Sequence, residues 1–209
     1  MLRLAAGLAL ALGVVAFAGY LALVGKGPFA AREMRHLRAM KDRAAAPAGY
    51  DDVTIAAFEA LPRHRPLAEY APLEARAVRM EGWVQRQLRA ADGDIHLELA
   101  PGARAPGGPD TLYVTAEVTS GWQRRLSGWD YAGLLAAFRP NAGDAVPYEQ
   151  GPRRVRLGGW LLYDFQHDPP DAGAAPAAGA VRASGWEIHP VTSIEVWDEA
   201  AGGWREWRR

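Results

Sequence analysis

ARAVRMEGWVQRQL, residues 75–88, has the alternating polar and apolar pattern of a single long β-strand, with Gly82 near its centre. A small closed barrel needs such a strand, because one strand must bend to serve both halves of the sheet and a glycine permits the bend. Four further strand-like segments and one helical segment follow along the chain. We predict strands at 75–88, 94–100, 111–119, 153–165 and 185–198, and a helix at 128–138.

The order of these segments, three strands, a helix and two strands, predicts an all-β fold. It is the order of an OB-fold-like five-stranded Greek-key β-barrel, with one helix between the third and fourth strands. Another small β-barrel or a sandwich with missing strands is the alternative. The barrel domain is therefore expected to occupy residues 75–198, and residues 199–209 are expected to form a tail.

The net charge of the chain divides into two different halves. The 209 residues carry 24 basic and 24 acidic side chains. Residues 1–50 hold seven basic and two acidic side chains, a net charge of +5, so residues 51–209 carry −5. An acidic folded domain argues against nucleic-acid binding, which needs a basic groove to neutralise phosphates. The chain has no cysteine, which excludes disulfides, thiolate zinc sites and thiol catalysis.

Residues 4–24 form an uncharged stretch that, as a helix, is long enough to cross the roughly 30 Å core of a bilayer. We therefore expect a transmembrane helix, with residues 1–26 acting as a membrane anchor in contact with lipid or as a signal peptide. The signal peptide would be cleaved after Ala16-Phe17-Ala18, and a buried soluble helix is a further alternative. Residues 27–74 are then expected to form a basic juxtamembrane helix and a proline-rich connector.

The predicted location is the bacterial inner membrane, with a single membrane pass. The side on which the folded domain lies stays open. Six basic residues between Lys26 and Arg43 favour the cytoplasm under the positive-inside rule, whereas an export signal favours the periplasm.

Alternation along the first three strands predicts which side chains point away from the apolar core. In the second strand, for example, Ile95, Leu97 and Leu99 are expected to face inward. In OB-folds the outer face of these strands is the usual ligand platform. A solvated face without a ligand is the equally weighted alternative. The residues expected to form this candidate ligand-binding face are Trp83, Gln85, His96, Glu98, Tyr113 and Thr115.

The last two strands contain motifs that carry a family resemblance. G-W-L-L-Y-D at 159–164 is followed by His167, and W-E-I-H-P-V-T follows at 186–192 after a variable loop. Together with D-I-H-L-E-L at 94–99, these strings resemble a poorly characterised family of bacterial OB-fold-like domains. The resemblance covers about residues 75–198. It implies a compact β-barrel with a recurring polar set, and it implies no established reaction.

Three histidines and two acidic residues fall at strand edges that an OB barrel would bring together. Imidazole and carboxylate ligands suit zinc, manganese or non-haem iron, so a divalent metal is the one cofactor that the residues suggest. The spacing matches no known ligand signature. The alternative, which we favour, is that these side chains hydrogen-bond within the fold. The candidate metal ligands are His96, Asp164, His167, Glu187 and His189.

These observations favour a membrane-anchored binding or assembly module of the bacterial envelope, whose partner is an unidentified protein or small molecule. One alternative is a metal-dependent hydrolase that uses the His, Asp and Glu residues above. A second alternative is single-stranded nucleic-acid binding on Trp83 and Tyr113, against which the charge of −5 counts. Whether the chain is an enzyme stays open.

Overall fold

The computed structural model describes most of the chain, and the described residues fall into two compact units, Met1–Arg43 and Ala44–Arg209. Each unit is considered by itself. The described residues are 2–23, 30–90, 92–103, 112–122, 124, 128–129, 131–138, 153–169 and 181–207.

The first unit contains two helices, α1 (Leu2–Leu23) and α2 (Arg32–Lys41). The side chains of α1 are described from residue 9 onward. Crossing a bilayer takes about 20 consecutive apolar residues, and across the described part of the chain no helix supplies a span of that length and hydropathy. The prediction of a single-pass inner-membrane protein, with residues 4–24 in the bilayer, is corrected accordingly.

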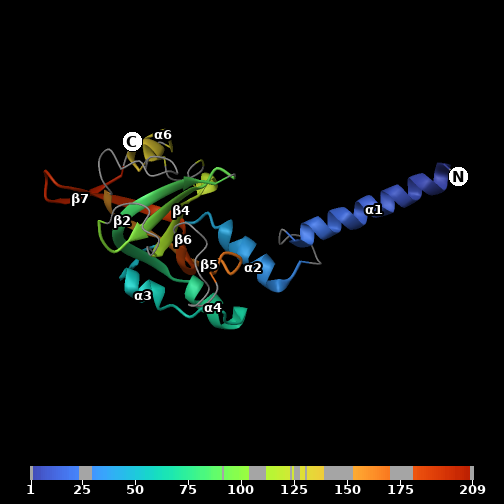
Figure 1. Cartoon of the computed structure of the whole chain (residues 1–209), viewed down its shortest axis with the longest axis horizontal. Coiled ribbons are helices and arrows are strands. Elements are labelled where there is room, and N and C mark those ends of the chain that lie inside the picture. Colours follow the sequence, from blue (N-terminus) through green and yellow to red (C-terminus); the bar gives the residue numbers. More distant parts are fainter. Residues whose placement is uncertain are drawn as a thin grey trace. The chain divides into compact units, whose positions relative to one another are not determined.

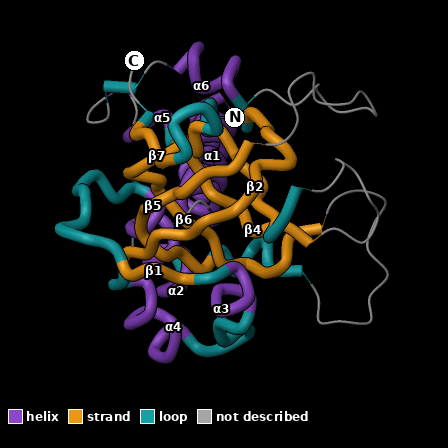
Figure 2. Tube along the Cα trace, turned by 90° about the vertical axis from the view of Figure 1, so that its left-hand side faces the viewer, coloured by secondary structure: helices purple, strands orange, loops and turns teal. Residues whose placement is uncertain are grey.

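The second unit is built on a closed five-stranded β-barrel (Figure 2). The strand order is β2-β3-β4-β6-β5, and β5 pairs again with β2 to close the sheet. All neighbouring pairs are antiparallel except β4 and β6, which are parallel. The predicted five-stranded barrel is therefore confirmed. Its strands are β2 (Ala77–Arg89), β3 (Ile95–Ala100), β4 (Leu112–Val118), β5 (Arg153–Tyr163) and β6 (Val181–Asp198).

The strand β2 serves both halves of the barrel, as its sequence predicts. Its first part, Ala77–Val84, pairs with β5, and its second part, Trp83–Arg89, pairs with β3. Gly82 lies at the change of partner, where a Cβ atom would come within 3.0 Å of the Leu99 side chain. A glycine at this position lets the two strands approach closely.

Two short strands extend the barrel sheet beyond the prediction. The strand β1 (Asp51–Val53) lies parallel to the start of β2. The strand β7 (Gly203–Glu206) pairs antiparallel with the end of β6, with Trp197 opposite Trp204. Part of the segment predicted as a tail is therefore an ordered edge strand.

Short helices lie at the two ends of the barrel (Figures 1 and 2). The helices α3 (Ile55–Glu59) and α4 (Leu67–Glu74) lie at one end, and α6 (Tyr131–Ala137) lies at the other. A further single turn, α5 (Ser120–Trp122), directly follows β4. The helix predicted between the third and fourth strands is thus present. The connector before residue 75 contains the helices α3 and α4, whose apolar residues pack on the core.

Candidate functional site

The polar side chains of β3, β4 and β6 form two rows on the side of the sheet that faces away from the apolar core. In one row His96 pairs with Glu117, and in the other Glu98 pairs with Thr115. The parallel pairing of β4 and β6 places Glu187 next to Thr115. We call this set the polar wall, and it consists of His96, Glu98, Thr115, Glu117, Glu187 and His189.

The polar wall is buried, although it is turned away from the core. Glu98 is 6% exposed, Glu117 is 4% exposed and Glu187 is fully buried. The His96 side chain retains 22% exposure. Removing three carboxyl groups from water is costly unless charges and hydrogen bonds compensate for it. The contacts within the polar wall therefore determine whether these carboxyl groups are fully stabilised by the fold or can also bind a ligand.

The centre of the polar wall is a contact between His189 and two carboxylates. Its Nδ1 atom lies 2.9 Å from Oε2 of Glu117 and 3.2 Å from Oε1 of Glu187. These distances suit ion pairs, yet among the described residues neither Nδ1 of His189 nor Oε1 of Glu187 has an aligned hydrogen-bond partner. Two buried polar atoms thus face one another with part of their bonding capacity unused.

Cationic side chains hold the other oxygen atoms of these two carboxylates. Arg182 donates from Nη1 to Oε2 of Glu187 at 2.9 Å and from Nη2 to Oε1 of Glu117 at 3.2 Å. The same Oε1 atom lies 3.2 Å from Nε2 of His96. Glu117 is therefore oriented through Oε1, and its Oε2 atom is left facing His189.

Charge and burial compete in the protonation of the polar wall. Burial alone would lower the pKa of His189, but the carboxylates of Glu117 and Glu187 outweigh it and raise that pKa to about 10. Burial raises the pKa of Glu187, and repulsion from Glu117 adds to this shift. Burial also raises the pKa of Glu98, against the opposing attraction of Arg182. The wall thus holds more negative groups than its described cations fully stabilise.

Asp94, at the turn before β3, adds a fourth carboxyl group beside the wall. An oxygen of Asp94, an oxygen of Glu117 and a ring nitrogen of His189 all lie within 4.8 Å of one another. Oδ1 of Asp94 also accepts a hydrogen bond of 2.6 Å from the backbone N–H of Ser120, which fixes the side chain. Burial raises the pKa of Asp94, while the Ser120 hydrogen bond lowers it.

The structure brings together only part of the predicted metal-ligand set. His96, Glu187 and His189 lie in the polar wall and are linked through Glu117 or by direct contact. Asp164 and His167 instead form a pair, with 2.8 Å between Oδ2 and Nδ1. Asp164 is fully buried, whereas the His167 side chain is 61% exposed.

Sequence reasoning missed Asp94 and Glu117 as members of this candidate metal-ligand group. A signal for each was present, because Asp94 begins the D-I-H-L-E-L string and Glu117 alternates with Thr115 along β4. Alternation indicates the side of a sheet to which a residue points. It does not indicate which residues of distant strands become neighbours when the barrel closes.

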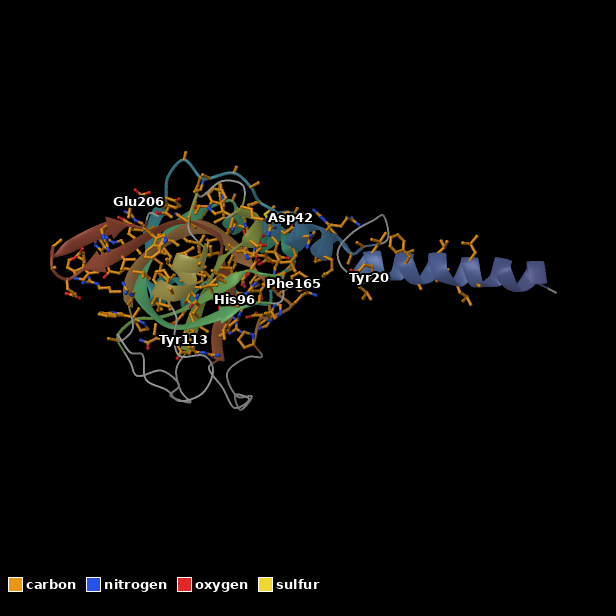
Figure 3. The ribbon with its side chains drawn as sticks, turned by 90° about the horizontal axis from the view of Figure 1, so that it is seen from above. Tyr20, Asp42, His96, Tyr113, Phe165 and Glu206 are labelled. Atoms are coloured by element: carbon orange, nitrogen blue, oxygen red, sulfur yellow. The ribbon has the colours of Figure 1, made fainter. Side chains whose placement is uncertain are left out.

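The residues of the predicted ligand-binding face are mostly buried. Tyr113 is 1% exposed, and Gln85 donates from Nε2 to the carbonyl of Gly102 at 2.7 Å. Glu98 accepts a 3.1 Å hydrogen bond from Thr115. Trp83 and His96 remain partly exposed. Figure 3 labels His96 and Tyr113 among the side chains of the barrel, and a binding role for the six residues stays a prediction.

A second polar cluster surrounds the buried carboxylate of Asp168, just after β5. It accepts hydrogen bonds from Nε of Arg63 at 2.9 Å, from the hydroxyl of Tyr163 at 2.5 Å and from the backbone N–H of Gly185 at 2.6 Å. Nε2 of His64 lies 3.4 Å from Oδ2. We call these five residues the Asp168 cluster. Burial and the Asp168 carboxylate together raise the pKa of Tyr163 to about 12.

Comparisons with known proteins add little to this description. No family model matches the chain, and no curated protein matches it. The resemblance to a bacterial OB-fold-like family therefore stays a prediction.

Several solved structures are similar to part of the chain at low TM-scores. An asparaginyl-tRNA synthetase from Entamoeba histolytica is 15% identical, with a TM-score of 0.31 over 70% of this chain and 25% of that protein. The OBody AM2EP06, solved bound to hen egg-white lysozyme, is 14% identical, with a TM-score of 0.32 over 66% of this chain and 94% of that one. The asparaginyl-tRNA synthetase of Pyrococcus horikoshii is 18% identical, with a TM-score of 0.28 over 57% of this chain and 20% of that one.

The chain thus spans about a quarter of the length of the first synthetase. The fold assignment rests on the strand order and pairing of the barrel itself.

Proposed function

We propose that the barrel is a binding module and that the polar wall, with Asp94 at its edge, is its ligand site. The observation that supports this most strongly is the pair of buried atoms, Nδ1 of His189 and Oε1 of Glu187, that lack aligned hydrogen bonds among the described residues. Buried polar groups in native proteins are nearly always satisfied, so an exception is a candidate contact for a ligand.

The charge of the wall favours a small ligand that carries positive charge. Glu98, Glu117 and Glu187 are three acidic side chains that share two cationic groups, because Arg182 and the ring of His189 both make ion pairs with the last two. A negatively charged ligand such as a nucleic acid would add repulsion to this surplus. Tyr113, which we considered as a base-stacking residue, is buried beneath the surface. Binding of single-stranded nucleic acid is therefore the weaker proposal.

A metal-dependent hydrolase is a second candidate, and the Asp94–Glu117–His189 group is the observation that favours it. Hydrolysis would require a bound metal with an open position for water. Incubating the full chain with Zn²⁺ or Mn²⁺ and chromogenic ester and phosphodiester substrates tests this candidate. Turnover that disappears in Asp94→Asn would support it, and the absence of turnover would reject it.

The binding proposal is tested by mapping where small probes contact the full chain. Backbone amide NMR spectra would be recorded with separate additions of Mg²⁺, Zn²⁺, lysine, guanidinium, AMP and a short single-stranded oligonucleotide at low salt. We expect at least one cationic probe to shift amides of β3, β4 and β6, and the oligonucleotide to shift none of them. If no probe shifts these strands, or if only the oligonucleotide does, the proposal is wrong.

A further inference from the structure

We propose that Asp94, Glu117 and His189 bind one divalent transition-metal cation such as Zn²⁺ or Mn²⁺. This inference rests on the proposed function and names the ligand class of the same site. It differs from the ligand set predicted from sequence, of which it keeps only His189.

The spacing of the three ligand atoms suits a single ion. They lie within 4.8 Å of one another. Ligand bonds of about 2.1 Å in a tetrahedral arrangement place ligand atoms about 3.4 Å apart. To reach the spacing of a tetrahedral site, each ligand atom must move by only about 1 Å. Small rotations about side-chain bonds are sufficient for such a shift.

The donor atoms have the chemistry of a transition-metal site. Two carboxylate oxygens and one imidazole nitrogen suit zinc and manganese, whereas magnesium and calcium prefer sites made of oxygen alone. Nδ1 of His189 is buried and faces the Glu117 and Glu187 carboxylates without an aligned hydrogen bond among the described residues, so a cation that displaces its proton gains a nitrogen ligand beside the same carboxylates. The unaligned geometry of this buried nitrogen is an observation additional to the acidic residues, which alone would not indicate a site.

Neighbouring side chains hold one proposed ligand in place. Oε1 of Glu117 accepts a hydrogen bond from Nη2 of Arg182 and lies near Nε2 of His96, and Oε2, which faces His189, is the atom that we expect to bind the metal. Hydrogen bonds of this kind to a ligating carboxylate orient it and strengthen metal sites. The adjacent Glu187 carboxylate adds negative charge that offsets the positive charge of Arg182.

Asp94 is the most exposed of the three proposed ligands, because it is only partly buried, whereas Glu117 and His189 are buried. A hydrated ion can therefore first meet Asp94 and then exchange its water molecules for the inner ligands. Because Asp94 lies in a turn and is not part of the packed core, it is also the ligand whose replacement least threatens folding.

The test uses the metal alone as the probe on the full chain. Metal-free protein would be titrated with Zn²⁺ and with Mn²⁺ by calorimetry, and the bound metal would be quantified after gel filtration. We expect one equivalent to bind and the thermal unfolding temperature to rise.

The variant Asp94→Asn tests the role of the Asp94 carboxylate. It keeps an oxygen that can accept the Ser120 N–H, so it should fold as before and bind the metal at least tenfold more weakly. Glu81→Gln, on the β2–β5 side of the barrel, is the matched control and should bind as the unchanged chain does.

Two results would overturn the inference. One is the absence of Zn²⁺ and Mn²⁺ binding to the folded chain at millimolar metal. The other is binding that Asp94→Asn leaves unchanged, which would assign the metal to surface histidines such as His167. If either result occurs while another cationic probe still shifts the amides of β3, β4 and β6, only the metal inference fails and the proposed binding module stands.

Discussion

The Asp168 cluster and the polar wall are built from the same kinds of side chain, yet their bonding differs. Asp168 is a single buried carboxylate with donors from Arg63, Tyr163 and Gly185, and His64 beside it. The polar wall instead places several carboxylates around Arg182 and His189, and two of its buried atoms lack aligned partners among the described residues. The two clusters therefore differ mainly in the number of hydrogen-bond donors available to each carboxylate, and less in burial or charge.

The difference assigns the Asp168 cluster a structural role. It ties the connector before α4 to the ends of β5 and β6, close to a row of rings in which the centroids of Tyr70 and Trp186 each lie 5.0 Å from that of Tyr163. The ring nitrogen of Trp186 also donates to the carbonyl of Pro62 at 2.9 Å. A cluster with every oxygen satisfied holds the fold together, whereas one with unused bonding capacity is available to a ligand.

The largest expected effect is the loss of the Asp168 carboxylate. Asp168→Ala leaves Arg63 and the Tyr163 hydroxyl without their acceptor in a buried setting, which should cost about 3–5 kcal/mol of unfolding free energy. Urea denaturation of the full chain measures this cost. Asp52→Ala, which removes an exposed partner of Arg79, is the control and should cost less than about 1 kcal/mol. A cost near that of the control would remove the structural role of the Asp168 cluster.

Replacing a carboxylate of the polar wall is expected to change the unfolding free energy less, and in the opposite direction. The pKa of Glu187 is raised, so the folded state favours its neutral form, and glutamine mimics that form. Glu187→Gln should therefore leave stability unchanged or raise it by about 1 kcal/mol at pH 8, and the gain should shrink at pH 4, where the native carboxyl is protonated. If Glu187→Gln is as damaging as Asp168→Ala, the two clusters do not differ as we argue.

The protonation of His189 gives the subtlest test. Its pKa of about 10 lies above the ordinary value of 6.5, so its charged form stabilises the fold. This contribution is fully present below about pH 6.5 and is lost as the pH rises through about 10. In metal-free protein, ¹³C-detected NMR should show the His189 ring still protonated at pH 8. A midpoint below about pH 7 would mean that the carboxylates do not control this ring.

The sequence was sufficient to predict the barrel because its signals are local. Alternation marks each strand, Gly82 marks the bend, and the order of elements limits the topology. The strand β7 was missed because four residues after a turn resemble a frayed end. The burial of Tyr113 and Glu117 was missed because alternation assigns polar positions to solvent by default. The pairing of His189 with Glu117 depends on strands far apart in sequence, which no local pattern reveals.

The parallel pair that closes the five-stranded barrel, β4 with β6, has a consequence for how the molecule forms. The strands β2, β3 and β4 are sequential neighbours, whereas Leu112 pairs with Val181 across a long stretch of chain. Closing a long loop costs entropy before its contacts can compensate, so non-local pairings form slowly. His96 and Glu117 lie on sequential strands and can meet early in folding, while Glu187 and His189 join them only when β6 pairs with β4. The carboxylates would then stay hydrated through most of folding, and the proposed ligand site would be assembled in the last step.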